Sequence, residues 1–206
     1  MKLILIYFLL LNFTFGSNEN QTWSSLNLKF NTPFSIKFNI EQSLRFEDQL
    51  SKFKQTFTEL SLSYKVNNLI RINIPYRHSI YKNKTKNRIS IGSSIKLNKK
   101  RIGTKYRLKF QSVKESDDPI EITSRNKLTI SYKMNKKVVP FIAYEIFNPY
   151  EQRMMGIDET RISFGSQIKI NKKRDIKLFY IHKREDQLKT KTNSLYILGL
   201  DYSLAF

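Results

Sequence analysis

Apolar and polar residues alternate along most of this chain with a period of two. Leu60-Ser61-Leu62-Ser63-Tyr64 and Ile70-Arg71-Ile72-Asn73-Ile74 are two such runs, one on each side of Asn67. A period of two is typical of β-strands with one apolar face. The alternation predicts strands over residues 23–31, 34–46, 54–66, 69–82, 88–98, 102–113, 121–134, 138–147, 160–170, 175–183 and 194–206.

An asparagine recurs between neighbouring strands. Lysine, an apolar residue and asparagine stand together five times, with the asparagines 31 to 37 residues apart, at Asn31, Asn67, Asn98, Asn135 and Asn171. A nearly fixed period indicates a repeated supersecondary unit. Because asparagine tolerates left-handed backbone conformations and suits tight turns, we interpret each unit as a β-hairpin. Longer polar stretches separate the hairpins, near residues 47–52, 82–87, 114–119, 148–159 and 184–193.

Strict alternation of short and long connections indicates a fold class. Antiparallel up-and-down transmembrane β-barrels of the bacterial outer membrane have short periplasmic turns and longer extracellular loops. Their strands need ~9–11 residues, which most of the runs provide. Bacterial single-chain barrels have an even number of strands, whereas eleven runs are visible. We therefore expect an all-β barrel of 10–12 strands. The alternation does not predict how the barrel closes.

The N-terminal residues are typical of a secretory signal. Lys2 precedes an apolar run at Leu3–Leu11, and the small residue Gly16 precedes Ser17. The run is far shorter than the ~20 residues that a membrane-spanning helix needs. We predict a cleaved signal peptide over residues 1–16 and one outer-membrane barrel domain over residues 17–206 of a Gram-negative bacterium.

The last predicted strand also favours the outer membrane. Every second residue from Tyr196 is apolar, and the final ones are Tyr202, Leu204 and Phe206. This ending is similar to the C-terminal signal that the barrel-assembly machinery reads. We therefore expect that machinery to be a partner, and the protein to be a monomer.

Three segments carry a family resemblance. Trp23–Arg45 (WSSLNLKFNTPFSIKFNIEQSLR), Arg161–Glu185 (RISFGSQIKINKKRDIKLFYIHKRE) and Leu195–Phe206 resemble the Gram-negative outer-membrane barrel family of unknown function DUF2490. The resemblance spans most of the mature chain. It implies a fold and a location, and it implies no activity and no catalytic residues.

The formal net charge of +20 needs a place in this fold. Such a charge alone suggests nucleic acid or anionic lipid as a partner, but an exported protein is not expected to bind nucleic acid. A cation facing lipid at mid-depth costs ~2–4 kcal/mol, so the alternation should point the basic residues into the lumen. The lumen candidates are Lys37, Arg71, Arg77, Lys105, Arg107, Lys109 and Arg161, with Glu59 and Glu145 as ion-pair partners.

Two interpretations of a basic lumen remain open. The long side chains could plug a narrow barrel, since about eight strands leave no free interior. They could instead line a narrow pore that favours anions. Basic short turns such as Lys99-Lys100-Arg101 are expected at the phospholipid of the inner leaflet, with lipopolysaccharide outside. The aromatic residues expected in interfacial girdles are Tyr76, Tyr81, Tyr132, Tyr144 and Phe147.

The sequence favours no enzyme. The chain has no cysteine, two histidines and no common catalytic motif, so we expect no catalytic residues, no metal and no cofactor. One alternative is a lipid-modifying enzyme at the outer rim, in which His182 would activate Ser194. Another is a soluble periplasmic β-barrel that carries a ligand.

Overall fold

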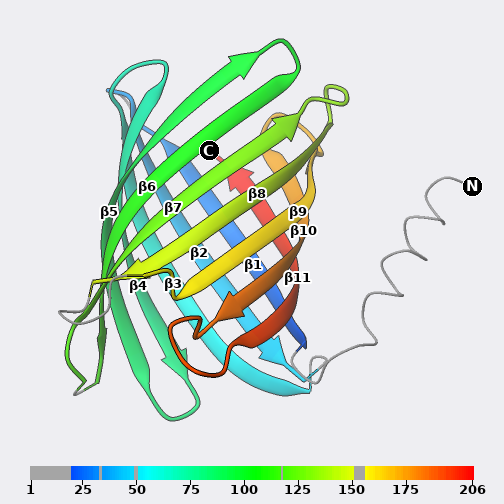
Figure 1. Ribbon diagram of the computed structural model, residues 1–206. Helices are drawn as coiled ribbons and strands as arrows, with labels where there is room; N and C mark the ends of the chain where they lie inside the picture. The colour runs from blue at the N-terminus through cyan, green and yellow to red at the C-terminus, as the bar shows by residue number, and fades with distance from the viewer. Residues whose placement is uncertain (1–19, 33, 49–50, 117, 151–155) are drawn as a thin grey trace, which may run out of the picture.

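The computed structural model describes residues 20–32, 34–48, 51–116, 118–150 and 156–206, and the predicted signal peptide lies outside these ranges. Eleven strands form within the described residues (Figure 1). They are β1 (Asn20–Asn31), β2 (Ile36–Glu47), β3 (Lys52–Lys65), β4 (Ile70–Tyr81), β5 (Thr85–Lys99), β6 (Ile102–Glu115), β7 (Glu121–Tyr132), β8 (Val138–Pro149), β9 (Glu159–Lys169), β10 (Arg174–Glu185) and β11 (Asn193–Ala205). Each corresponds to one run of alternating residues.

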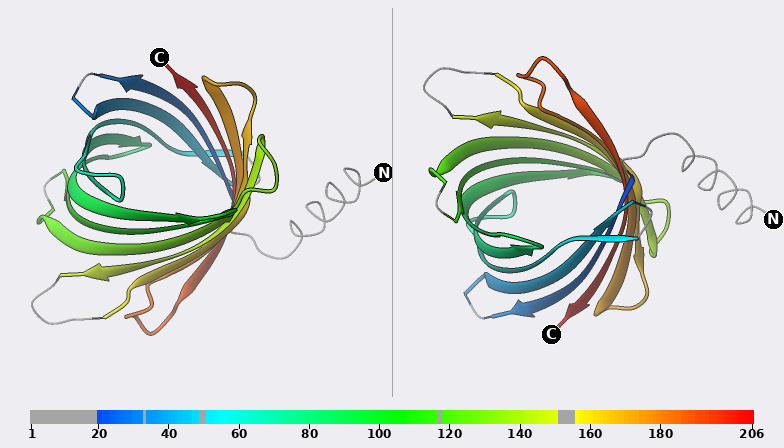
Figure 2. Two further views of the ribbon diagram at one scale, coloured as in Figure 1. Left: turned by 90° about the horizontal axis from the view of Figure 1, so that it is seen from above. Right: turned by 90° about the horizontal axis from the view of Figure 1, so that it is seen from below.

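The strands close into a single barrel, and Figure 2 shows this ring from both ends. Consecutive strands pair antiparallel, but β1 and β11 pair parallel, from Asn20 opposite Tyr196 to Lys29 opposite Ala205. The expectation of a wholly antiparallel barrel is therefore wrong at this seam. Consecutive strands alternate in direction and their number is odd, so the first and the last strand point the same way. These two strands can therefore pair only in parallel. No helix among the described residues is long and apolar enough to cross a bilayer.

The recurring asparagine stabilises turns through its side chain. Asn67 Oδ1 accepts hydrogen bonds from the backbone N–H groups of Leu69 and Ile70, both at 2.8 Å. Asn135 and Asn171 do the same in the β7–β8 and β9–β10 turns. None of these three asparagines has a positive φ. The asparagine therefore acts as a side-chain acceptor that satisfies two turn amides, and the left-handed role expected for it is wrong.

The connections at the opposite end are less uniform than expected. Only Lys82, Asn83 and Lys84 separate β4 from β5, and the backbone N–H of Tyr81 donates to the carbonyl of Lys84 at 2.8 Å. This connection is as short as the asparagine turns, so the strict alternation of short and long connections is wrong here. The connection between β8 and β9 is the longest. We call the asparagine-turn end the short-turn end and the other the long-loop end.

The barrel is apolar outside and polar inside. Along β6, Tyr106, Leu108 and Phe110 point outward, whereas Lys105, Arg107 and Lys109 alternate with them and point inward. Outward Leu62 and Ile91 are 53% and 55% exposed, while inward Glu145 is 2% exposed. A soluble protein buries its large apolar side chains, so this distribution is the reverse of the usual one.

A small apolar cluster lies inside the wall of β10 and β11. Phe179, Ile181 and Ile197 form it, with Trp23 and Phe141 packed against it. Phe179 stands opposite Gly165 on one side and Gly199 on the other. A Cβ on Gly199 would overlap the Phe179 ring, and a Cβ on Gly165 would overlap the backbone of Leu178 and Phe179. The two glycines thus make room for one inward aromatic ring.

Candidate functional site

Glu59 anchors one cluster of charges inside the barrel. Its Oε2 accepts hydrogen bonds from Arg77 Nε at 2.7 Å and from Arg88 Nη2 at 3.0 Å. Glu59 and Arg77 are opposite each other on β3 and β4, and Arg88 is opposite Arg77 on β5. Two guanidinium groups therefore share one buried carboxylate, which leaves a net positive charge.

Glu145 anchors a second, larger cluster. Its Oε1 accepts hydrogen bonds from Nη2 of Arg107 at 2.8 Å and of Arg125 at 2.9 Å. Its Oε2 lies 3.3 Å from Nζ of Lys127. These partners come from β6 and β7, and the carboxylate is almost fully buried. One carboxylate thus faces three cations, so every lone pair it presents has a charged donor nearby.

Aromatic rings connect the two clusters. Arg77 and Arg45 flank Phe57, with guanidinium carbons 3.5 and 5.0 Å from the ring centroid. Arg45 also lies 3.6 Å from the centroid of Trp23. Such stacks of guanidinium on aromatic faces are attractive, and more so when desolvated.

The stack continues on the far side of Trp23. Arg161 lies 5.7 Å from the Trp23 centroid and 4.5 Å from that of Phe147, and Arg125 lies 4.4 Å from Phe147. We call the resulting series the arginine–aromatic layer. It runs in the order Arg77, Phe57, Arg45, Trp23, Arg161, Phe147 and Arg125. Phe147 therefore faces the lumen, and Tyr81 has the same inward parity as Arg77. The assignment of these two residues to an outer aromatic girdle is wrong.

The arginine–aromatic layer lies toward the long-loop end. Trp23 and Arg161 stand near the starts of β1 and β9, whereas Arg45 and Phe147 stand near the ends of β2 and β8. Strands β10 and β11 lie between Trp23 and Arg161 and carry the apolar cluster that Trp23 contacts, whereas β5 and β6 contribute no member to the series. Phe57 is 2% and Ile197 0% exposed, so both side chains are enclosed by their neighbours at this level of the lumen.

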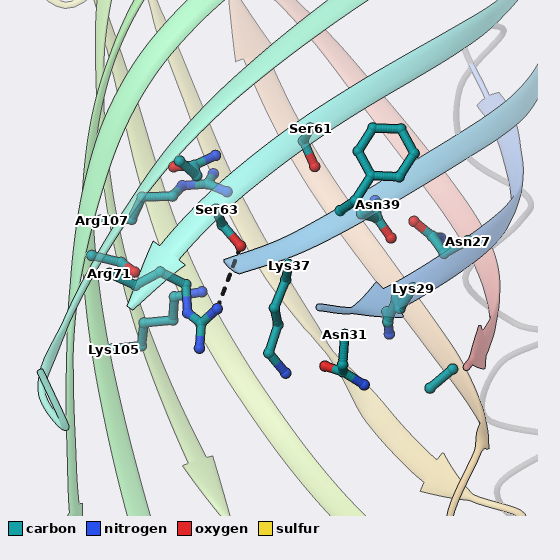
Figure 3. Close-up of a pocket in the computed structure, with 14 residues that line it drawn as sticks. Asn27, Lys29, Asn31, Lys37, Asn39, Ser61, Ser63, Arg71, Lys105 and Arg107 are labelled. Atoms are coloured by element: carbon teal, nitrogen blue, oxygen red, sulfur yellow. Dashed lines mark hydrogen bonds between the residues drawn. The ribbon is translucent and has the colours of Figure 1, made fainter. Parts of the chain in front are cut away.

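A cavity occupies the lumen on the short-turn side. Its volume is about 340 Å³, and Figure 3 shows the polar side chains around it. We call it the basic vestibule. Its lining residues are Asn27, Lys29, Asn31, Lys37, Phe38, Asn39, Ser61, Ser63, Arg71, Asn73, Ser94, Lys105, Arg107 and Ala205.

The cations of the basic vestibule differ in their partners. Lys29 lies 3.5 Å from Asp175, and Arg107 is bound to Glu145. Among the described residues, Lys37, Arg71 and Lys105 form no ion pair, and Arg71 reaches only the Ser63 hydroxyl at 3.4 Å. Most predicted lumen candidates thus fall into two groups, vestibule residues and members of the charge clusters, while Arg161 belongs to the arginine–aromatic layer.

Lys109 belongs to neither group. It faces the lumen between them, is 5% exposed, and forms no ion pair or hydrogen bond within the described ranges. Arg88 and Arg125 are buried cluster members that sequence reasoning overlooked. Both have inward parity, Arg125 in β7 and Arg88 near the start of β5, so alternation alone could have found them.

The residues of the predicted insertion signal and the His182–Ser194 pair lie outside the lumen. Tyr202 and Leu204 face outward, and Phe206 stacks on Phe30 with centroids 5.0 Å apart. His182 and Ser194 also face outward, but they pair in register with Tyr196 and Arg184. The His182 ring stacks on Tyr196 at 5.1 Å, and the hydrogen bonds seen in the described chain include none between His182 and Ser194. The structure therefore does not assemble the pair into an activated serine.

The long-loop rim is held by polar contacts. The backbone N–H of Gln187 donates to the carbonyl of Asp158 at 2.9 Å, which ties the β10–β11 loop to the residues before β9. Lys189 donates to the Asp186 carboxylate at 2.6 Å, and this hydrogen bond lowers the pKa of Asp186. No cluster of three or more metal-binding side chains occurs in the part of the chain that the structure describes.

Comparisons with known proteins found a family and structural neighbours. The model of a family described as "Protein of unknown function (DUF2490)" matches residues 20–194. A solved structure, the anion-selective porin from Comamonas acidovorans, is similar with a TM-score of 0.41 and 10% sequence identity. The match covers 83% of this chain and 53% of the porin chain, so this chain spans about half the porin's length. No curated protein matches the sequence.

Proposed function

The chain belongs to the DUF2490 family, and from the geometry of its lumen we propose that it is an outer-membrane β-barrel that is closed at rest. In this proposal the apolar outer surface faces lipid, the short turns lie in the periplasm, and lipopolysaccharide surrounds the long-loop end. The arginine–aromatic layer and its two buried carboxylates act as a built-in plug. The role at rest is structural, without a steady conduction path.

The reversed polarity of the barrel is the observation that carries the membrane assignment. Large apolar side chains such as Leu62, Ile91 and Ile142 are about half exposed, while charged ones such as Glu145 and Lys109 are buried. Water would disfavour that outer surface, since burying apolar area from water contributes about 25 cal/mol per Å². A soluble ligand-carrying barrel would need the opposite arrangement, with apolar residues around its cavity.

The packing of the layer supports closure over an open pore. Glu59 and Glu145 each bind side chains from neighbouring strands, and Arg161 bridges β9 to Trp23 on β1. Charges held in pairs and stacks are costly to separate in a medium of low dielectric. An open channel at this level would require those contacts to break.

A gated, anion-preferring channel is the second candidate. The observation that favours it is the basic vestibule, where Lys37, Arg71 and Lys105 converge without paired carboxylates among the described residues. Rings of basic side chains select anions. If the layer rearranges, the vestibule would then supply the selectivity.

Planar-bilayer recordings of the refolded protein under a salt gradient test the proposal. We expect heat-dependent gel mobility, dependence on detergent or lipid, and insertion without steady conductance steps. Protease protection in liposomes verifies that silent bilayers contain the protein. Discrete anion-selective steps from the unmodified protein would refute closure at rest. A protein that stays folded and monodisperse without detergent would refute the membrane assignment.

A further inference from the structure

The basic vestibule contains more positive charge than its own carboxylates neutralise. Lys37, Arg71 and Lys105 come from β2, β4 and β6, so they approach the cavity from three parts of the wall (Figure 3). None of them forms an ion pair within the described residues. Like charges that share a partly desolvated cavity repel each other, and a bound anion removes that repulsion.

An unused hydrogen-bond donor adds a second observation. Arg107 lines the vestibule and gives Nη2 to Glu145, but its Nε is buried and has no acceptor among the described residues. A buried donor without an acceptor destabilises the folded state. Because this Nε is enclosed by protein atoms, an anion in the vestibule satisfies it only if the Arg107 side chain shifts toward the cavity.

The remaining lining suits an oxyanion. Hydroxyl groups of Ser61, Ser63 and Ser94 and the amide of Asn73 surround the cations. Guanidinium groups bind phosphoryl oxygens through two parallel hydrogen bonds, while lysine contributes a compact charge. A phosphomonoester carries about −1.5 to −2 charges near neutral pH, so it compensates three cations better than a monocarboxylate does.

Size and access restrict the ligand further. About 340 Å³ lies at the small end of the range for ligand pockets, roughly 300–1,000 Å³, which suits a compact group. Basic turns, including Lys99–Arg101 and Lys172–Arg174, lie at the same short-turn end of the barrel. Such a rim raises the local concentration of anions.

We propose that the basic vestibule binds the dianionic phosphoryl group of a small molecule through Lys37, Arg71 and Lys105. The inference goes beyond a closed barrel, because a phosphoryl site on the short-turn side requires no conduction path. Titration of the detergent-folded protein tests ligand binding in the vestibule, whereas bilayer recordings test closure by the arginine–aromatic layer. Failure of the binding proposal can therefore be told apart from failure of the proposed closed barrel.

The experiment is calorimetric titration in a neutral detergent at roughly 0.15 M salt, where weak surface attraction is screened. The probes are glycerol 3-phosphate, inorganic phosphate, a soluble short-chain phosphatidate and acetate. We expect saturable binding of the phosphoryl compounds and much weaker binding of acetate. Tighter binding of the phosphatidate would identify a lipid headgroup as the source, and equal or weaker binding would identify a water-soluble phosphate.

Variants show whether the binding belongs to this cavity. Arg71→Gln and Lys105→Gln should each weaken binding of glycerol 3-phosphate by about tenfold or more, as expected for a lost charge-assisted hydrogen bond. Lys172→Gln removes the same charge at the same end of the barrel but outside the cavity, and should change binding less than twofold. Both vestibule variants should fold, because each removes a repelled cation; heat-dependent gel mobility checks this. Absence of saturable binding, equal affinity for acetate, or equal losses in all three variants would overturn the proposal.

Discussion

Arg125 on β7 and Glu145 on β8 lie inside the barrel with the guanidinium Nη2 2.9 Å from the carboxylate Oε1. The same carboxylate binds Arg107 and Lys127, so it is the single anion of a cluster with three cations. Removing its charge would leave those cations buried against one another.

Glu145→Gln should therefore destabilise the folded barrel strongly. Breaking a buried pair by removing one partner costs about 3–5 kcal/mol, because the remaining charge stays desolvated. Urea unfolding in detergent micelles, followed by gel mobility, measures the loss. Glu41→Gln is the matched control, since Glu41 also faces the lumen but forms no ion pair among the described residues. Equal effects of the two substitutions would show that the Glu145 cluster has no special role.

Substitutions of the two glycines beside Phe179 should behave differently. In Gly199→Ala the new methyl meets the Phe179 ring, whereas in Gly165→Ala it meets the backbone carbonyl of Leu178. Both should cost about 1–3 kcal/mol, the usual range for overpacking. Phe179→Leu should rescue the first and not the second, because a side chain can shrink but a backbone carbonyl cannot. A double-mutant cycle on unfolding free energies measures the coupling, and rescue of both variants would contradict this geometry.

The alternation of apolar and polar residues predicts which face of the barrel a side chain is on, but not which other side chains it contacts. Lys105 and Arg107 were assigned to the lumen because Tyr106 and Leu108 must meet lipid, and the structure places them so. Which cations share Glu145 depends on strand register and tilt, which are properties of the closed barrel.

The parallel seam shows a similar limit. The strand runs were all visible, but the usual even number cast doubt on a count that was correct. The pairing of Asn20 with Tyr196 is a contact between the two ends of the chain, and local periodicity contains no information about it. Phe147 was misassigned because an aromatic residue near a strand end is compatible with either face, and only its parity within β8 decides.

Charges placed on the outer surface should affect insertion according to depth. Ile91 lies in the middle of β5 and Ile80 next to the long-loop end of β4, and both face outward. A lysine costs ~2–4 kcal/mol at the bilayer midplane and ~0–1 near the interface. Ile91→Lys should therefore reduce spontaneous insertion into liposomes, while Ile80→Lys should be nearly neutral. Equal insertion of the two variants would argue against a lipid-facing surface.

The turn asparagines should contribute to stability through their side-chain acceptors. Asn67→Ala removes two hydrogen bonds to turn amides and should cost about 1 kcal/mol. Asn67→Asp keeps an acceptor oxygen and should retain most of the stability. Asn98→Ala is the control, because Asn98 occupies the same place in the repeat but lies within β5. Unfolding midpoints compare the three variants; a loss for Asn98→Ala as large as for Asn67→Ala would contradict the acceptor role.

Removal of the Phe147 ring should open the lumen to ions. It is sandwiched between Arg125 and Arg161, so Phe147→Ala deletes a ring that both guanidinium groups contact and leaves the cations in place. We expect conductance steps in planar bilayers where the unmodified protein is silent, with a reversal potential that favours anions. Adding Arg107→Glu should weaken that selectivity, because Arg107 lines the path on the vestibule side. Phe179→Ala removes a ring of the same size that lies outside the layer and should remain silent. Conductance steps from both phenylalanine variants would mean that general loosening opens the barrel. Absence of steps from Phe147→Ala would mean that side chains outside this layer close it.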